Sequence, residues 1–174
     1  FKKMYDSIYK YDIIKLTKIR HSQAFIARPH YFGKTMTVDI LYNLFTGNKE
    51  IFEKLHAKCL NEWDFSNKYT VLLLSFNINI VTYEHFVQTL KNYLWMVAKK
   101  YKIDIQLSAE LTPTDILAEI LNRLTENYTK EIIVLVDNFD YCLFTKPTDV
   151  SFKPYVALLG SLVNIFKTYK DNIK

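Results

Sequence analysis

Two short and almost entirely apolar runs constrain the fold of this chain most strongly. VLLLSF occupies residues 71–76, and IIVLV occupies residues 132–136. Runs of this length without polar alternation are typical of strands buried on both faces, as in a parallel sheet covered by helices. A third run, at residues 24–27, is a further candidate strand. The sequence therefore predicts an α/β fold with a mainly parallel sheet.

The segments between these runs carry apolar residues at helical spacing. The spacing predicts a helix after Gly33, one capped by Thr82, one starting at Thr112 and Pro113, and a last one over residues 155–169. The apolar positions expected to face the core are Met36, Ile40, Leu41, Leu44 and Phe45 in the first helix, Phe86, Leu90, Tyr93, Leu94, Val97 and Tyr101 in the second, Ile116, Leu117, Ile120, Leu121 and Leu124 in the third, and Tyr155, Leu158, Leu159, Leu162, Val163, Phe166 and Tyr169 in the last.

Length and composition narrow the class of protein. The 174 residues suffice for one core, so a single domain over residues 1–174 is expected. The net charge of +5 suits phosphate-bearing ligands, although the basic residues form no dense block. Cys59 and Cys142 lie far apart without a partner motif, which indicates a reduced intracellular setting, cytoplasmic or nuclear. No apolar run approaches ~18 residues, so no membrane partner is expected, and the initial Phe1 suggests that the chain is part of a longer protein.

The tripeptide Gly33-Lys34-Thr35 follows a strand-like run and opens a predicted helix. Backbone N–H groups at a helix N-terminus can hold phosphate oxygens, the lysine can neutralise the β/γ charge, and the threonine hydroxyl can bind Mg²⁺. The pattern G-x-x-x-x-G-K-[ST] is incomplete, because Arg28 occupies the position of its first glycine. The alternative is an ordinary helix start with a glycine turn. The candidate residues for binding ATP are Arg28, Pro29, His30, Tyr31, Phe32, Gly33, Lys34, Thr35 and Met36.

A carboxylate ends the apolar run at residues 132–136. Asp137 stands at the carboxyl end of this predicted strand, where open α/β sheets bind ligands. We expect Asp137 to bind Mg²⁺ together with Thr35, directly or through water, and Asp140 to add negative charge or to order the following loop. An acidic turn after a strand is also common without any ligand. The pairing with the glycine-lysine-threonine motif favours a nucleotide site, with Asp137 as a catalytic candidate.

Residues 28–35, RPHYFGKT, resemble the degenerate Walker A sequence R-P-R-R-F-G-K-[ST] of the AAA-ATPase-like family. The arginine, proline, aromatic residue, glycine, lysine and hydroxyl are kept, while His30 and Tyr31 stand where the family has arginines. Further likeness lies in residues 44–45 and 51–55, in Trp63, and in the strand that ends at Asp137. The resemblance covers nearly the whole chain. It implies a P-loop NTPase-like three-layer α/β/α sandwich that binds ATP and Mg²⁺.

Departures from the family pattern weaken the expected hydrolysis. The family segment D-E-Y-D reads DNFD at residues 137–140, so Asn138 replaces a glutamate that polarises the attacking water. The catalytic candidates that the resemblance implies are therefore Asp137 and Asn138. An amide cannot accept a proton, and loss of general-base help costs about 10²- to 10⁴-fold in rate. His30 and Tyr31 also remove two positive charges from a phosphate-facing loop. The resemblance thus implies an ATP-binding module with weak or lost hydrolysis, acting as a regulatory or scaffolding part of a larger protein.

The resemblance also bears on what surrounds this module. It implies a further core strand beyond the last helix, so the sheet is expected to be incomplete at the C-terminal end. Family members often continue into a nuclease-like domain of the PD-(D/E)XK kind, so such a domain or another protein is a candidate partner.

Two other functions remain open. One is a nucleotide-free interaction domain or scaffold, favoured by His30, Tyr31 and Asn138. The other is a nucleic-acid-associated ATPase, favoured by the net charge of +5 and by the nuclease companions of the family.

His56 and Cys59 form an i, i+3 pair that would need two further ligands to hold a metal such as zinc.

Overall fold

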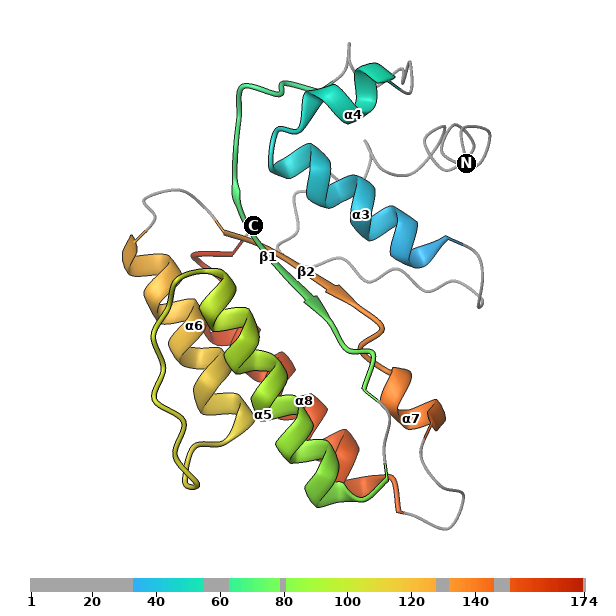
Figure 1. The fold of residues 1–174 in the computed structure, drawn as a ribbon, viewed down its shortest axis with the longest axis vertical. Helices are drawn as coiled ribbons and strands as arrows, with labels where there is room; N and C mark the ends of the chain where they lie inside the picture. The colour runs from blue at the N-terminus through green and yellow to red at the C-terminus, as the bar shows by residue number, and fades with distance from the viewer. Residues whose placement is uncertain (1–32, 55–62, 79–80, 128–131, 146–150, 174) are drawn as a thin grey trace. The chain divides into compact units, whose positions relative to one another are not determined.

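A computed structural model describes residues 33–54, 63–78, 81–127, 132–145 and 151–173 (Figure 1). By their contacts these residues fall into two compact units. The first unit holds the described residues up to Leu73 and residues 132–137, and the second holds those from 74 to 127 and from 138 to 173. The candidate strand at residues 24–27 lies outside the described residues, and the single domain over residues 1–174 stays a prediction.

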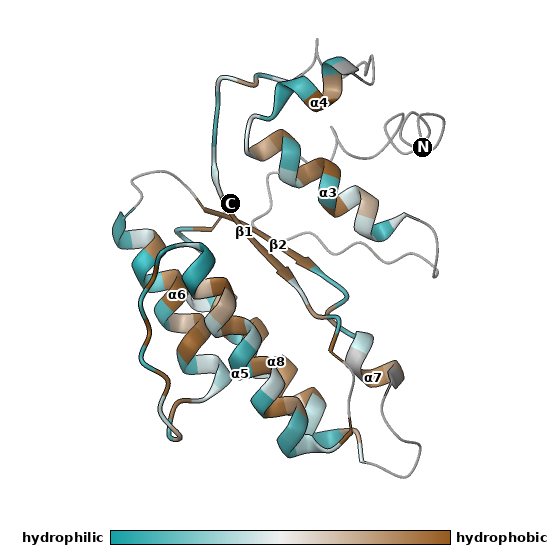
Figure 2. Cartoon of the chain, viewed as in Figure 1, coloured by the Kyte–Doolittle hydropathy of each residue, from teal (hydrophilic) through white to brown (hydrophobic). Residues whose placement is uncertain are grey.

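Two strands form a small parallel sheet, β1 from Thr70 to Ser75 and β2 from Ile132 to Asp137. Both are strongly apolar, as Figure 2 shows, and Leu72 is fully buried. The mixed helix and strand content confirms the α/β prediction, and the strands expected at residues 71–76 and 132–136 are present. The three-layer sandwich remains a prediction.

In the first unit, helix α3 (Lys34–Phe45) packs on β2 and on the short helix α4 (Lys49–Lys54). The helix expected after Gly33 is therefore confirmed. Its core face joins Phe52 of α4, and Leu135 of β2 packs against the same cluster. The buried members of this cluster are Ile40, Leu41, Leu44 and Phe52.

The turn between α3 and α4 is closed by the segment at residues 63–69. Trp63 donates its Nε1–H to the Leu44 carbonyl at 3.2 Å and meets the Phe45 ring edge-on at 5.6 Å. Gly47 has a φ of 73°, in the left-handed region that favours glycine. A Cβ on this glycine would lie 2.9 Å from Cγ of Lys68 and 3.1 Å from the Phe65 carbonyl oxygen. Both the backbone conformation and the space at this turn therefore require glycine.

The second unit contains α5 (Tyr83–Lys100), α6 (Pro113–Asn127), α7 (Tyr141–Thr145) and α8 (Lys153–Thr168). Helix α6 packs against both α5 and α8, and the three long helices expected here are confirmed. Tyr155 is fully buried, and its ring meets Tyr83 edge-on at 5.3 Å and Phe86 at 5.4 Å. The buried apolar residues of these helices are Phe86, Leu90, Leu94, Val97 and Ala98 in α5, Pro113, Ile116, Leu117, Ile120, Leu121 and Leu124 in α6, and Tyr155, Leu159 and Leu162 in α8.

Helix α8 buries less of its apolar stripe than the sequence predicts. Leu158, Val163, Phe166 and Tyr169 are only half-buried. The apolar face of α8 is wider than the part of it that neighbouring residues cover. The spacing of apolar residues alone therefore overestimates how many of them are buried. Gly160 lies in the interior of this helix, on an exposed side, with no atom within 4 Å of an added Cβ.

Both predicted helix caps are present. The Thr82 hydroxyl accepts the His85 N–H at 3.1 Å at the start of α5. At the start of α6, Thr112 Oγ1 accepts the Asp115 N–H at 3.2 Å, and Asp115 Oδ2 accepts the Thr112 N–H at 2.8 Å. Side-chain and backbone hydrogen bonds from Thr112 hold the pKa of Asp115 below its usual value. This reciprocal capping box satisfies N–H groups that a helix start otherwise leaves unpaired.

Side chains of α5 hold the connection to α6. Lys91 is buried, and its Nζ donates to the carbonyl oxygens of Ser108 at 3.2 Å and Ala109 at 3.3 Å. One helical turn further along, Trp95 donates its Nε1–H to the Ile105 carbonyl at 3.0 Å. Two side chains four residues apart thus fix the connection through its backbone.

Among the helices that the structure describes, none is long and apolar enough to cross a membrane.

Two glycines are expected to respond oppositely to alanine. Gly47→Ala should lower the free energy of unfolding by about 1–2 kcal/mol, because the left-handed backbone and the contact with Lys68 both oppose a Cβ. Gly160→Ala should raise it by about 0.5–1 kcal/mol, because alanine favours the helix and the position is open. Urea unfolding followed by circular dichroism measures both, and equal effects at the two positions would contradict this account of the turn.

The capping box of α6 predicts a pH dependence. Because the folded state lowers the pKa of Asp115, it favours the ionised carboxylate, so this contribution to stability is present above the unfolded pKa and is lost as pH falls through the folded pKa. Asp115→Asn should therefore destabilise the chain at pH 7, and the difference from the wild type should shrink below about pH 4. Urea unfolding of both proteins from pH 7 to pH 3 tests this, and a constant difference would argue against it.

Candidate functional site

Helix α3 begins at the glycine of the predicted phosphate-binding motif. Gly33 is its N-cap, with φ 73° and ψ 24°, a left-handed conformation that favours glycine. This cap makes no side-chain hydrogen bond, and the first turn of α3 contains no acidic residue. A helix start leaves its first N–H groups without helical acceptors and carries partial positive charge. The start of α3 is therefore suited to bind an anion through its backbone.

Two threonines near this helix start differ in environment. Thr37 is fully buried, and both its N–H, at 2.8 Å, and its Oγ1, at 2.9 Å, donate to the Gly33 carbonyl oxygen. Thr35, the predicted Mg²⁺ ligand, is exposed, while Lys34 and Met36 are half-buried. Thr37 therefore holds the glycine turn, whereas the side chain of Thr35 is accessible to a ligand.

Asp137 is the last residue of β2 and is 6% exposed. Helix α3 contacts β2, and the two elements run in opposite directions in Figure 1. The start of the helix and the carboxyl end of the strand consequently lie at the same end of the first unit. Met36 and Leu135 pack against the same apolar cluster, which fixes this arrangement.

In the second unit, Asn138 adopts a left-handed conformation with φ 55°. Its Nδ2 donates to Oδ1 of Asn77 at 2.8 Å, and Nδ2 of Asn77 donates to Oγ of Ser75 at 3.1 Å. The Ser75 N–H in turn donates to the hydroxyl of Tyr93 on α5 at 2.5 Å. Burial raises the pKa of Tyr93, a rise that the hydrogen bond from Ser75 opposes. The sequence analysis did not single out Asn77, although a polar residue directly after a buried strand was a usable signal.

The remaining predicted residues are placed as follows. Arg28, Pro29, His30, Tyr31 and Phe32 lie outside the described residues, as do His56 and Cys59. Asp140 is exposed, and its carbonyl oxygen accepts the Leu143 N–H at 2.9 Å at the start of α7.

Metal binding depends on which donor side chains the described residues bring together. Within the part of the chain that the structure describes, no three His, Cys, Asp or Glu side chains come together as a metal cluster. Thr35 carries a hydroxyl and Asp137 a carboxylate, and oxygen donors of this kind are the class that Mg²⁺ prefers, with phosphate oxygens and water completing its shell.

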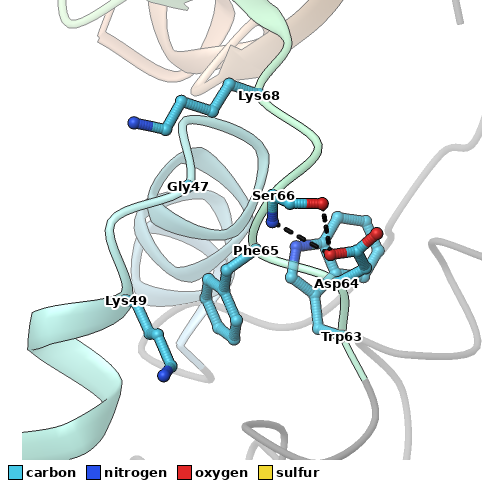
Figure 3. A pocket seen from close by; sticks show the side chains of 7 residues that line it. All are labelled: Gly47, Lys49, Trp63, Asp64, Phe65, Ser66 and Lys68. Atoms are coloured by element: carbon cyan, nitrogen blue, oxygen red, sulfur yellow. Dashed lines mark hydrogen bonds between the residues drawn. The ribbon is translucent and has the colours of Figure 1, made fainter.

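An open hollow of about 470 Å³ lies elsewhere in the first unit (Figure 3). It is lined by Gly47, Lys49, residues 63–66 and Lys68, and none of these is a predicted site residue. Hydrogen bonds from the side chain and backbone of Ser66 lower the pKa of Asp64 at its edge. These bonds order the loop that faces Gly47. The hollow therefore lies between this loop and the α3–α4 turn, away from the predicted site residues.

Comparison with known proteins gives one family and one relative. A family model described as "Predicted AAA-ATPase" matches residues 3–174. The "Uncharacterized protein in vnfD 5′region" of Azotobacter chroococcum mcd 1 is 27% identical over 154 residues. This match covers 85% of the chain but only 28% of the relative, so the chain spans less than a third of that protein's length. No solved structure matches the chain.

The two threonines predict different responses to valine, which keeps their shape but removes the hydroxyl. Thr37→Val should lower the free energy of unfolding by about 1 kcal/mol, because a buried hydrogen bond to Gly33 is lost. Thr35→Val should change it by less than about 0.5 kcal/mol, because the side chain is exposed. Urea unfolding of both variants measures the difference, and a larger loss for Thr35→Val would contradict the structural role given to Thr37.

Proposed function

Because this chain belongs to the family of predicted AAA-ATPases, we propose that it binds ATP where α3 begins and β2 ends. The observation that carries the proposal is that Gly33-Lys34-Thr35 opens a helix packed on the strand that ends at Asp137. The proposed architecture is one P-loop domain over residues 1–174, a three-layer α/β/α sandwich with a mainly parallel sheet.

In this proposal, the start of α3 binds the phosphates. The N–H groups of Lys34, Thr35 and Met36 belong to the first helical turn and are available to phosphate oxygens. The left-handed Gly33 turns the chain into the helix without a Cβ beside the phosphates. Lys34 supplies the compensating charge. Among residues 28–32, which lie outside the described residues, Arg28 is proposed as a second cation, and His30 and Tyr31 in place of arginines should weaken the affinity.

In this proposal, Thr35 and Asp137 bind the Mg²⁺ ion. Mg²⁺ bound with the nucleotide would supply the positive charge that offsets the β- and γ-phosphates. Asp137 would hold it through a carboxylate oxygen, directly or through water, and Thr35 through its hydroxyl. The accessible side chain of Thr35 and the position of Asp137 at the strand end support this assignment.

We infer slow or absent hydrolysis, because Asn138 stands where the family has glutamate and an amide cannot take a proton from water. The module would then act as an intracellular regulatory or scaffolding part of a larger protein. A nuclease-like domain or another protein is the proposed partner, since the related protein from Azotobacter is much longer than this chain.

A nucleotide-free scaffold is the second candidate. His30, Tyr31 and Asn138 favour it, because they replace two positive charges and a proton acceptor that the family pattern places at this site.

Titration of ATP with Mg²⁺ by calorimetry tests the proposal. We expect wild-type protein to bind and Lys34→Ala to bind at least about 10-fold more weakly, because charge-assisted hydrogen bonds to phosphate are lost. Lys49→Ala is the matched control. Lys49 is an exposed lysine of the same unit that pairs with Glu53 at 3.0 Å, and its loss should leave ATP affinity unchanged.

Equal affinities for wild type and Lys34→Ala would remove the phosphate assignment. No binding at millimolar ATP would favour the nucleotide-free scaffold. In the same samples, phosphate release by the wild type should stay near background, and rapid turnover would overturn the inference about Asn138.

A further inference from the structure

The amides of Asn138 and Asn77 form a continuous hydrogen-bonded chain with Ser75, which we call the amide clasp. It runs from Asn138 Nδ2 to Asn77 Oδ1 at 2.8 Å, and from Asn77 Nδ2 to Ser75 Oγ at 3.1 Å. Asn77 thus accepts from one side and donates to the other, which fixes the orientation of its amide. A carboxylate or an aliphatic side chain at residue 77 could not make both bonds in this sense.

The backbone of Asn138 explains why a clasp is needed. Its φ of 55° is left-handed, a conformation that is unfavourable for most side chains but that asparagine tolerates better. A glutamate, the residue of the family at this position, lacks the short amide that stabilises such turns. The amide donor of Asn138 is also committed to Asn77. The side chain is therefore used to hold the turn.

The clasp is anchored on α5. The Ser75 N–H donates to the Tyr93 hydroxyl at 2.5 Å. The ring of Phe76 packs against Tyr93 at 5.9 Å and meets Phe139 edge-on at 5.3 Å. Asn138 and Phe139 are thus held by two consecutive residues, Asn77 and Phe76, after the end of β1.

We propose that Asn77 is a positioning residue, which acts through Asn138 to fix the path of the chain directly after Asp137. Asn138 is bonded to Asp137, so its backbone conformation sets the orientation of the peptide group next to the predicted Mg²⁺ ligand. Asn138 then serves the site through its backbone turn and does not act on water. This inference rests on the proposed function, because it assigns a role to Asp137 in binding Mg²⁺.

The role predicts an effect on metal-dependent affinity alone. Phosphate binding at the start of α3 does not involve the clasp, so ATP affinity in EDTA should not depend on Asn77. The gain in affinity on adding Mg²⁺ should depend on it. Glycine at residue 138 adopts the left-handed turn without a side chain, so it should make the clasp unnecessary.

The experiment uses the full chain as wild type, Asn77→Ala, Asn138→Gly and the double variant, each titrated with ATP in Mg²⁺ and in EDTA. We expect Asn77→Ala to reduce the Mg²⁺-dependent gain by about 3- to 10-fold, the effect of losing one positioning hydrogen bond, and to leave the EDTA affinity unchanged. In the Asn138→Gly background, Asn77→Ala should have no effect. Equal losses in Mg²⁺ and EDTA, or the same loss in both backgrounds, would overturn the proposal.

Urea unfolding of the same four proteins separates failure of this inference from failure of the proposed function. Asn77→Ala should raise the unfolding equilibrium constant by about 3-fold when Asn138 is present and should raise it less with glycine there, where only the exposed bond from Asn77 to Ser75 is lost. If the wild type binds no ATP, the proposed function fails and the metal-directed role of Asn77 fails with it, while this coupling still supports the clasp. Additive effects in unfolding would overturn the clasp itself.

Discussion

The packing of α3 on β2 is the interaction on which the candidate site depends. The 12 residues of α3 rise about 18 Å, and the 6 residues of β2 extend about 20 Å, so the two elements match in length. They run in opposite directions (Figure 1), so one apolar contact, which includes Leu135, sets the start of the helix beside the end of the strand. The positions of Gly33 and Asp137 thus follow from burial of apolar surface by other residues of α3 and β2.

Much of this arrangement could be predicted from the sequence, because it depends on local patterns. Continuous apolar runs identified both described strands, spacing identified the long helices, and the caps at Thr82 and Thr112 follow from side chains that reach their own helix start. The short helix α7 and the exposure along α8 could not be predicted, since they depend on neighbouring elements. Asn77 was missed for the same reason. Its role requires knowing that the segment after β1 lies beside Asn138, which is 61 residues away.

Asn138 stands where the resemblance to the AAA-ATPase-like family expects a glutamate. Its structural surroundings change how this difference is interpreted. Compared with the family pattern, Asn138 is a missing proton acceptor. In the structure it occupies a left-handed turn and donates to Asn77. A glutamate there could not donate to the Asn77 carbonyl oxygen, so the hydrogen bond in this chain requires the amide of Asn138. The proposed slow or absent hydrolysis and the hydrogen-bonded turn are compatible with the same asparagine.

The connection between α5 and α6 has a consequence for sequence change in this protein. Lys91 and Trp95 bind only backbone carbonyls of that connection, at Ile105, Ser108 and Ala109. Every residue type offers the same carbonyl oxygen. The exposed side chains there can therefore be exchanged freely without altering the path of the loop, while the two anchoring positions on the helix cannot. Such a loop is a suitable place to insert a recognition sequence or a label.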